Sequence, residues 1–304
     1  MFLFVGELAA VVTSLCWSFT STFFTLAGRL VGSVVVNRIR LLLAVLFLVL
    51  AHFLLRQPLP FGAAPWRWFW LTLSGLFGLV IGDAFLFQAF VWIGPRLSML
   101  MLSTAPIFST VLAWLFLGER LSGLELAGIA VTTLGIAWVV LDRAGSGGAG
   151  NGGPEPPTHF RLGLLFGVGA AVGQALGYVT AKKGLAGAFS ALSGTLIRMI
   201  AAAAILWLVT LLLGQVRPTF AALRRRPEAM KYILGGAFFG PFLGVTLSLV
   251  AVQRTQVGIA STLLALPPIF LLPISHFVFK ERIGWGAIAG TLVAVAGVAI
   301  LALA

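Results

Sequence analysis

One carboxylate lies inside an otherwise apolar, helix-length segment: Asp83, in the sequence "GLVIGDAFLFQAF". A carboxylate at the centre of a membrane-crossing helix costs roughly 2.5–3.5 kcal/mol, so this residue needs a compensating role. It could bind a proton or a cationic group, or it could form a structural ion pair with Arg40 or Arg198. Both arginines follow isoleucine at matching places in the chain. Each could hold a carboxylate, pair with Asp83 or reach the membrane surface.

A stripe of polar side chains marks the first apolar segment. At 100° per residue, one narrow sector holds Glu7, Ser14, Ser18, Ser21 and Thr25. Such a stripe faces either a water-filled cavity or another helix, and Trp17 beside it could stack a flat substrate. In the segment 161–181 the matching sector contains Gln174 and Tyr178, whose amide and phenol groups need partners in lipid. The residues predicted to line a substrate cavity are Glu7, Ser14, Trp17, Ser18, Ser21, Asp83, Gln174 and Tyr178.

Two stretches repeat one pattern at a spacing of 162 residues. "APIFSTVLAWLFLGERL" covers residues 105–121 and "PPIFLLPISHFVFKERI" covers 267–283. The charges that close them, Glu119-Arg120 and Glu281-Arg282, could form a gate or could fix the helix ends at the bilayer edge. A proline removes one helical hydrogen bond, so the opening prolines predict either static kinks or hinges. These prolines are Pro106, Pro267 and Pro268.

The composition excludes a soluble domain. The chain of 304 residues is 60% hydrophobic and 9% charged, with a mean hydropathy of +1.08, so it cannot build a solvated surface. The net charge of +12 comes from residues scattered between apolar segments, which is typical of membrane loops and argues against nucleic-acid binding. We find no phosphate-binding loop, no metal-ligand spacing and no nucleophile motif. The sequence therefore predicts no cofactor, no metal and no enzyme active site.

Apolar segments long enough to cross a bilayer predict an all-α, polytopic membrane protein with ten helices. Their approximate limits are 3–27, 34–55, 67–91, 96–117, 122–141, 161–181, 190–213, 229–252, 257–279 and 284–303. The Gly- and Pro-rich stretch 142–160 is typical of a flexible linker. It separates a first five-helix repeat (1–141) from a second one (161–304).

The odd number of spans in each repeat determines their relative orientation. The second repeat must enter the membrane from the opposite side, so the two are related by an axis in the membrane plane. This inverted plan is typical of secondary transporters, with the substrate site between the halves. Two other interpretations stay open, a membrane-embedded enzyme acting on a lipid-linked substrate and a structural membrane protein.

The fourth and fifth segments of each half also carry a family resemblance. "LFLGERLSGLELAGIAVTTLGI" and its repeat "FVFKERIGWGAIAGTLVAVAGV" resemble the EamA-domain members of the drug/metabolite transporter superfamily. The resemblance covers essentially the whole chain as two tandem domains. It implies ten helices in inverted repeats, a central cavity and efflux or exchange of small metabolites such as amino acids. We expect a multi-pass protein of a prokaryotic inner or plasma membrane, monomeric or weakly dimeric, with protons as a candidate coupling ion.

Overall fold

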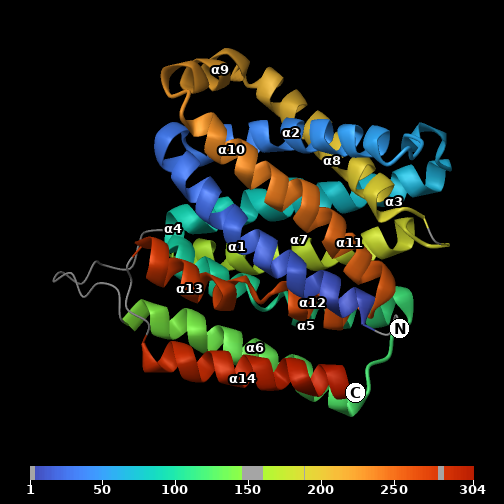
Figure 1. Cartoon of the computed structure of the whole chain (residues 1–304), viewed down its shortest axis with the longest axis vertical. Helices are drawn as coiled ribbons and strands as arrows, with labels where there is room; N and C mark the ends of the chain where they lie inside the picture. Colours follow the sequence, from blue (N-terminus) through green and yellow to red (C-terminus); the bar gives the residue numbers. More distant parts are fainter. Residues whose placement is uncertain (1–3, 146–159, 188, 280–283) are drawn as a thin grey trace.

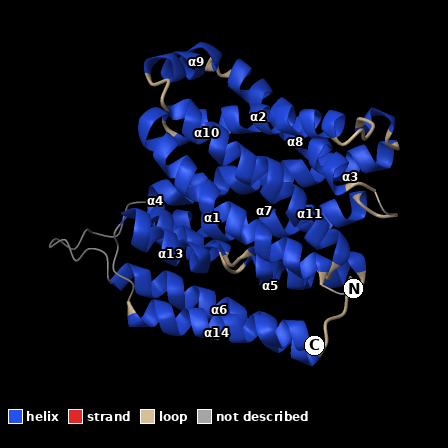
Figure 2. Ribbon diagram, in the orientation of Figure 1, coloured by secondary structure: helices blue, strands red, loops and turns tan. Residues whose placement is uncertain are grey.

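The computed structural model describes residues 4–145, 160–187, 189–279 and 284–304. Every regular element among these residues is a helix (Figures 1 and 2). Before residue 146 the helices are α1 (Val5–Val31), α2 (Ser33–Leu54), η1 (Pro60–Gly62), α3 (Pro65–Gly75), η2 (Leu76–Gly82), α4 (Asp83–Leu102), α5 (Ala105–Leu117) and α6 (Gly123–Gly145). After residue 159 they are α7 (Phe160–Gly184), α8 (Ala191–Leu212), α9 (Val216–Arg225), α10 (Ala229–Ala237), η3 (Phe238–Gly244), α11 (Val245–Arg254), α12 (Val257–Leu264), α13 (Pro267–Phe279) and α14 (Trp285–Leu303).

The lengths and hydropathy of these helices confirm a polytopic all-α membrane protein. Eight helical segments in the described part are long and apolar enough to cross a membrane, and two shorter apolar segments, Ala105–Leu117 and Trp285–Leu301, accompany them. Together they correspond to the ten predicted spans. Large apolar side chains such as Trp114, Leu134 and Leu292 are exposed on the outer surfaces, as expected for residues that face lipid.

One predicted helix boundary is wrong. The third span was expected to end at residue 91 and the fourth to begin at 96, but α4 continues to Leu102. Neighbours on α7 nevertheless show where the chain turns back. Phe85 contacts Gly169, Ile93 contacts Gly163, and Met101 returns to Gly167. The reversal therefore lies between residues 93 and 101, a stretch that contains Gly94 and Pro95, although α4 remains helical through it.

The repeat is visible in an unusual local feature. Residues 76–82 (η2) and 238–244 (η3) both form π-helical turns, and they are 162 residues apart. A π-turn inserts an extra residue into the helical hydrogen-bond pattern and is frequently found at functional sites. Two breaks follow at the same spacing, at Ser103–Thr104 and Ala265–Leu266.

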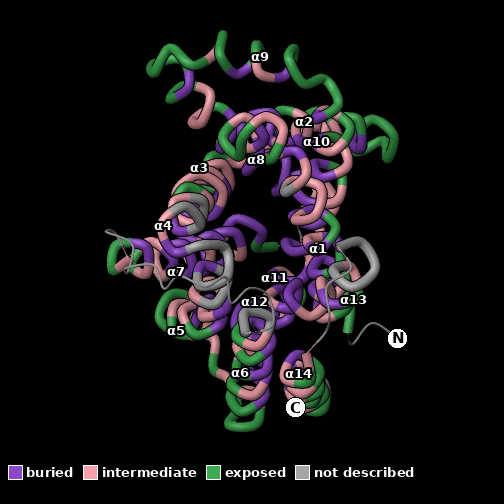
Figure 3. The backbone as a smooth tube through the Cα atoms, turned by 90° about the vertical axis from the view of Figure 1, so that its left-hand side faces the viewer, coloured by how far each residue is buried: buried purple, intermediate pink, exposed green. Residues whose placement is uncertain are grey.

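The two halves are interlocked rather than side by side. Helix α7 of the second half packs against α3, η2, α4 and α5 of the first, and α1 of the first half packs against α10, η3 and α11–α13 of the second. The equivalent helices α2 and α8 pair with each other, as do α6 and α14. Figure 3 shows α7 beside α3–α5 on one side and α1 beside α10 and α13 on the other. This exchange of equivalent contacts is what an inverted repeat related by a pseudo-two-fold axis requires.

The direction of each helix defines two faces of the molecule. The N-terminal ends of α1 and α12 and the C-terminal ends of α5, α7, α11 and α14 come together at the face where both chain termini lie (Figure 1). We call it the termini face. Helix α9 lies at the opposite face, where the guanidinium of Arg38 donates to Thr219 over 2.8 Å and also to Gln215.

Candidate functional site

A pair of opposite charges joins α2 and α4 inside the membrane-crossing region. Arg40 on α2 donates through Nη2 to Oδ2 of Asp83, the first residue after the π-turn η2. The other edge of the guanidinium is held by Asn37, whose Oδ1 accepts from Arg40 Nε over 2.7 Å. Of the roles that the sequence left open for Asp83, the structure contains the ion pair with Arg40.

The second arginine of the matching pair has a different environment. Arg198 on α8 is 3% exposed, and its Nε and Nη1 have no hydrogen-bond partner among the described residues. Its charge acts on Asp83 across the site, but no ion pair between them is formed in the described structure. Its Nη2 lies against Gly78 of η2, so close that a Cβ at that glycine would be 3.3 Å away. The π-turn therefore places the backbone of Gly78, which has no side chain, against the guanidinium of Arg198.

Two neutral polar groups on α7 complete this central cluster of Arg40, Asp83, Gln174, Tyr178 and Arg198. The amide Nε2 of Gln174 donates to the hydroxyl of Tyr178 over 2.7 Å. Tyr178 is 3% exposed, and the charges of Arg198 and Asp83 both act on it. The cluster thus collects side chains from α2, α4, α7 and α8, which belong to both halves, and carries a formal charge of +1 (two arginines, one aspartate).

The serine stripe of α1 contacts another helix in this conformation. The hydroxyls of Ser14 and Ser18, both 0% exposed, donate to the carbonyl oxygens of Leu263 (2.6 Å) and Pro267 (3.2 Å). Pro267 has no N–H to offer the Leu263 carbonyl four residues earlier, and that oxygen accepts a long bond of 3.3 Å from the Leu266 N–H and the shorter one from Ser14.

The other members of the α1 stripe also make local contacts. Ser21 donates to the Ser18 carbonyl over 2.9 Å. The indole of Trp17 lies against Gly244 at the end of η3. Ser14, Trp17 and Ser18 therefore contact the opposite half, which is one of the two roles that the stripe predicted, whereas the bond of Ser21 to the Ser18 carbonyl stays within α1.

The predicted prolines lie in the first turns of helices. Pro106 is in the first turn of α5, and Pro267 and Pro268 begin α13, each directly after a two-residue break in the helix. The expected interruption of these spans is therefore present. A proline is well accommodated there, because the first-turn N–H groups have no helical partner.

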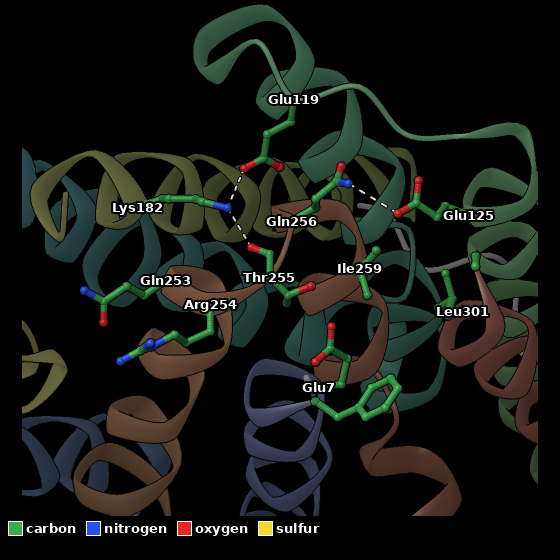
Figure 4. A pocket seen from close by; sticks show the side chains of 12 residues that line it. Glu7, Glu119, Glu125, Lys182, Gln253, Arg254, Thr255, Gln256, Ile259 and Leu301 are labelled. Atoms are coloured by element: carbon green, nitrogen blue, oxygen red, sulfur yellow. Dashed lines mark hydrogen bonds and ion pairs between the residues drawn. The ribbon is translucent and has the colours of Figure 1, made fainter. Parts of the chain in front are cut away.

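A cavity of about 470 Å³ opens at the termini face (Figure 4). Its lining includes Glu7 from the predicted stripe and Glu119 from the predicted gate. The remaining lining residues are Phe4, Glu125, Lys182, Gln253, Arg254, Thr255, Gln256, Ile259, Leu301 and Ala304. Five of the twelve, residues 253–256 and Ile259, come from the two sides of the α11–α12 break, so the cavity lies above an interrupted helix.

Glu119 and Lys182 close that break from opposite halves of the chain. Lys182 Nζ lies 2.6 Å from Glu119 Oε1 and donates to the Thr255 carbonyl over 2.6 Å. Glu119 Oε2 accepts from the N–H of Val257, the first residue of α12, over 2.7 Å. A helix break leaves backbone groups without helical partners, and the ion pair satisfies one carbonyl, of Thr255, and one amide, of Val257. We call Glu119, Lys182, Thr255 and Val257 the termini-face lock; Figure 4 shows the first three.

The sequence identified Glu119 but not its partner. Arg120 is exposed, and Glu281 and Arg282 lie outside the described residues. Lys182 was missed because its role depends on the packing of α7 against α5, although a lysine pair at the end of an apolar helix was a visible signal. Glu125 was also missed. It forms a reciprocal cap with Ser122 (2.6 and 3.1 Å) and accepts from Gln256 over 3.3 Å.

Comparisons with known proteins agree with this architecture. The model of the EamA-like transporter family matches residues 4–141 and 161–303, which is both repeats. A solved structure titled "Crystal structure of protein" has the same fold, with a TM-score of 0.76 and 18% sequence identity, over 98% of each chain. The chain is also similar to a Pseudomonas fluorescens protein named probable 4-amino-4-deoxy-L-arabinose-phosphoundecaprenol flippase subunit ArnE. They are 35% identical over 96 residues, which is 29% of this chain and 84% of the relative.

Proposed function

The chain belongs to the EamA-like transporter family, and from this premise we propose that it is a secondary transporter that exports small organic metabolites by alternating access. The observation that carries the proposal is the central cluster. A net charge of +1 is placed among membrane-crossing helices of both inverted halves, where charge is costly and is typical of a substrate or ion pathway. We place the protein in a prokaryotic inner or plasma membrane, as a monomer or weak homodimer.

The proposed cycle uses the interlocked halves. In the described conformation the termini-face lock ties α5, α7 and the α11–α12 break together. Breaking the lock would free the α12–α13 segment to move at its own break, beside Pro267 and Pro268. This movement would expose the central cluster from the termini face. Pro106 and the Ser103–Thr104 break provide the equivalent hinge in the first half.

Asp83 is the candidate for proton coupling. It is the only carboxylate of the central cluster, and it faces Arg40 on α2, Arg198 on α8 and Tyr178 on α7. In this proposal, protonation would release Arg40 from its ion pair and change the charge of the cluster by one unit.

Counterflow in proteoliposomes tests the proposed function. Vesicles loaded with an unlabelled metabolite should accumulate the labelled form transiently, because only a carrier exchanges solute across a sealed membrane. A panel of amino acids and organic acids serves as substrates, and protein-free liposomes are the control. Absence of counterflow for the whole panel, from a folded protein, would refute the proposal of a small-metabolite carrier.

A lipid-linked substrate is the second candidate, and the similarity to the flippase subunit favours it. The test is the movement of a fluorescent lipid-linked sugar phosphodiester between the leaflets of the same vesicles. Movement of this lipid without solute counterflow would assign the chain to lipid transport. A membrane enzyme would instead convert such a lipid in detergent micelles, which have no compartments.

A further inference from the structure

Arg198 is a buried cation that forms no ion pair with any residue in the described part of the chain. The residue is 3% exposed, and neither Nε nor Nη1 donates a hydrogen bond to any described residue. Buried guanidinium groups are normally paired, because an uncompensated charge in a low-dielectric interior is strongly unfavourable. The partner of this group must therefore come from elsewhere in the molecule or from a ligand.

The surrounding helices cannot supply a carboxylate. The principal neighbours of α8 are α2, α3, η2 and α11, and none of them contains Asp or Glu. Helix α7, which brings Tyr178 close, contains none either. The nearby acid is Asp83, and it is already bound to Arg40. His52, on α2, is bound to the hydroxyl of Ser193 on α8 over 3.0 Å.

The two matching arginines therefore differ in their contacts. Arg40 is held on two sides, by Asp83 and by Asn37 at 2.7 Å. Arg198 occupies the equivalent place in the other half and is held on neither of the two nitrogens named above. Beside it lie a phenol and an amide, Tyr178 and Gln174, which can hydrogen-bond to a ligand without adding charge.

We propose that Arg198 binds a singly charged anionic group of the transported molecule. This inference rests on the proposed function and names the substrate class of that site. The formal charge of +1 in the central cluster is neutralised by one negative charge and would be reversed by two. A guanidinium matches the two oxygens of a carboxylate in geometry. A lipid phosphodiester offers the same charge and oxygens, so the experiment includes both sources.

Ligand-induced thermal stabilisation of the purified protein tests the site without requiring transport. Matched pairs of a monocarboxylate and its uncharged amide are compared, together with a phosphodiester lipid and a phosphate monoester dianion. We expect the monocarboxylate or the phosphodiester to stabilise the wild type. The uncharged amide, or the doubly charged phosphate monoester, should need a concentration at least about tenfold higher for the same thermal shift. Equal stabilisation by acid and amide would overturn the proposal.

Substitution separates a binding role from a structural one. Arg198→Met removes an unpaired charge, so the ligand-free protein should be at least as stable as the wild type while anion binding is lost. Arg40→Met leaves Asp83 without its partner and should lower stability. Arg198→Lys should retain part of the binding. If Arg198→Met unfolds the ligand-free protein, Arg198 is structural and the proposal is wrong.

Two further variants act as controls. Gly78→Ala keeps every charge but places a methyl group about 3.3 Å from Arg198 Nη2, so it should weaken anion binding. Arg38→Met removes another buried arginine, one that is bound to Thr219 and Gln215, and should leave the preference for acid over amide unchanged. Anion binding without counterflow would refute the proposed function alone. Counterflow that is unaffected by Arg198→Met would refute this inference alone.

Discussion

The termini-face lock can be opened by a substitution that changes one atom of Glu119. Glu119→Gln keeps an oxygen that can accept from the Val257 N–H, now 2.7 Å away, but removes the ion pair with Lys182. The Glu119 side chain is 14% exposed and the Lys182 side chain 25%, so the pair is neither fully exposed nor fully buried. A surface pair is worth about 0–1 kcal/mol, and breaking a buried pair costs about 3–5 kcal/mol. We expect a loss of about 1–2 kcal/mol for the closed state.

This energy sets the expected change in population. One or two kcal/mol corresponds to a shift of about five- to thirtyfold toward states open at the termini face. The probe is Ser261→Cys in a Cys16→Ala background. Ser261 is 2% exposed, lies one turn inside α12 from the lock and contacts Ser109 over 3.0 Å. A membrane-impermeant maleimide added at the termini face should label it about five- to thirtyfold faster in the Glu119→Gln variant.

Two controls make the result decisive. Glu228→Gln breaks an exposed ion pair with Arg226, 3.5 Å long, and should leave the labelling rate unchanged. Exchanging the charges, Glu119→Lys with Lys182→Glu, restores the pair but puts a cation at the N-terminus of α12, so recovery should be partial. An unchanged labelling rate in Glu119→Gln would mean that the lock does not hold this face closed.

Three other predictions concern the scaffold and the central cluster. Asp83→Asn should abolish the pH dependence of transport while the protein still reaches the membrane, and a pH profile of counterflow that matches the wild type would remove Asp83 from coupling. Ser14→Ala leaves the Leu263 carbonyl with only the long bond from the Leu266 N–H and should cost about 0.5–1.5 kcal/mol of stability, measured as a lower thermal midpoint in detergent. Gly173→Ala puts a Cβ about 3.0 Å from Gly82 Cα and should destabilise by about 1–3 kcal/mol, whereas Gly62→Ala, with open space around it, should not.

The repeat made most of the fold predictable from the sequence. A spacing of 162 residues, read from proline, glycine and charge, recurs in the π-turns η2 and η3 and in the breaks before α5 and α13. Hydropathy placed the spans because lipid contact constrains nearly every position along a helix. The boundary at residues 94–96 was wrong as a helix end, since local composition marks a reversal but does not decide whether helical hydrogen bonds continue through it.

The partners of the polar residues could not be read from the sequence to the same extent. Arg40 and Arg198 have matching sequence surroundings, yet only Arg40 is paired with Asp83, because the counterpart of this acid in the other half is Val245. Ser14 and Ser18 each donate to a carbonyl that is 249 residues away in the sequence. Periodicity identifies which side of a helix is polar, but only tertiary packing decides which group meets it.

The helix packing follows the repeat but the charged contacts do not, and this difference affects the whole proposed cycle. Helix packing follows the repeat closely, since α1 and α7 exchange equivalent neighbours. The lock does not follow it. At the spacing of 162, the amide that Glu119 caps, on Val257, corresponds to Pro95, which has no N–H. A mirror image of this cap is therefore chemically impossible in the other half. A carrier can alternate between two equivalent packings of its helices while its charges make the two states unequal in energy, and in the cycle that we propose these charges favour closure at the termini face.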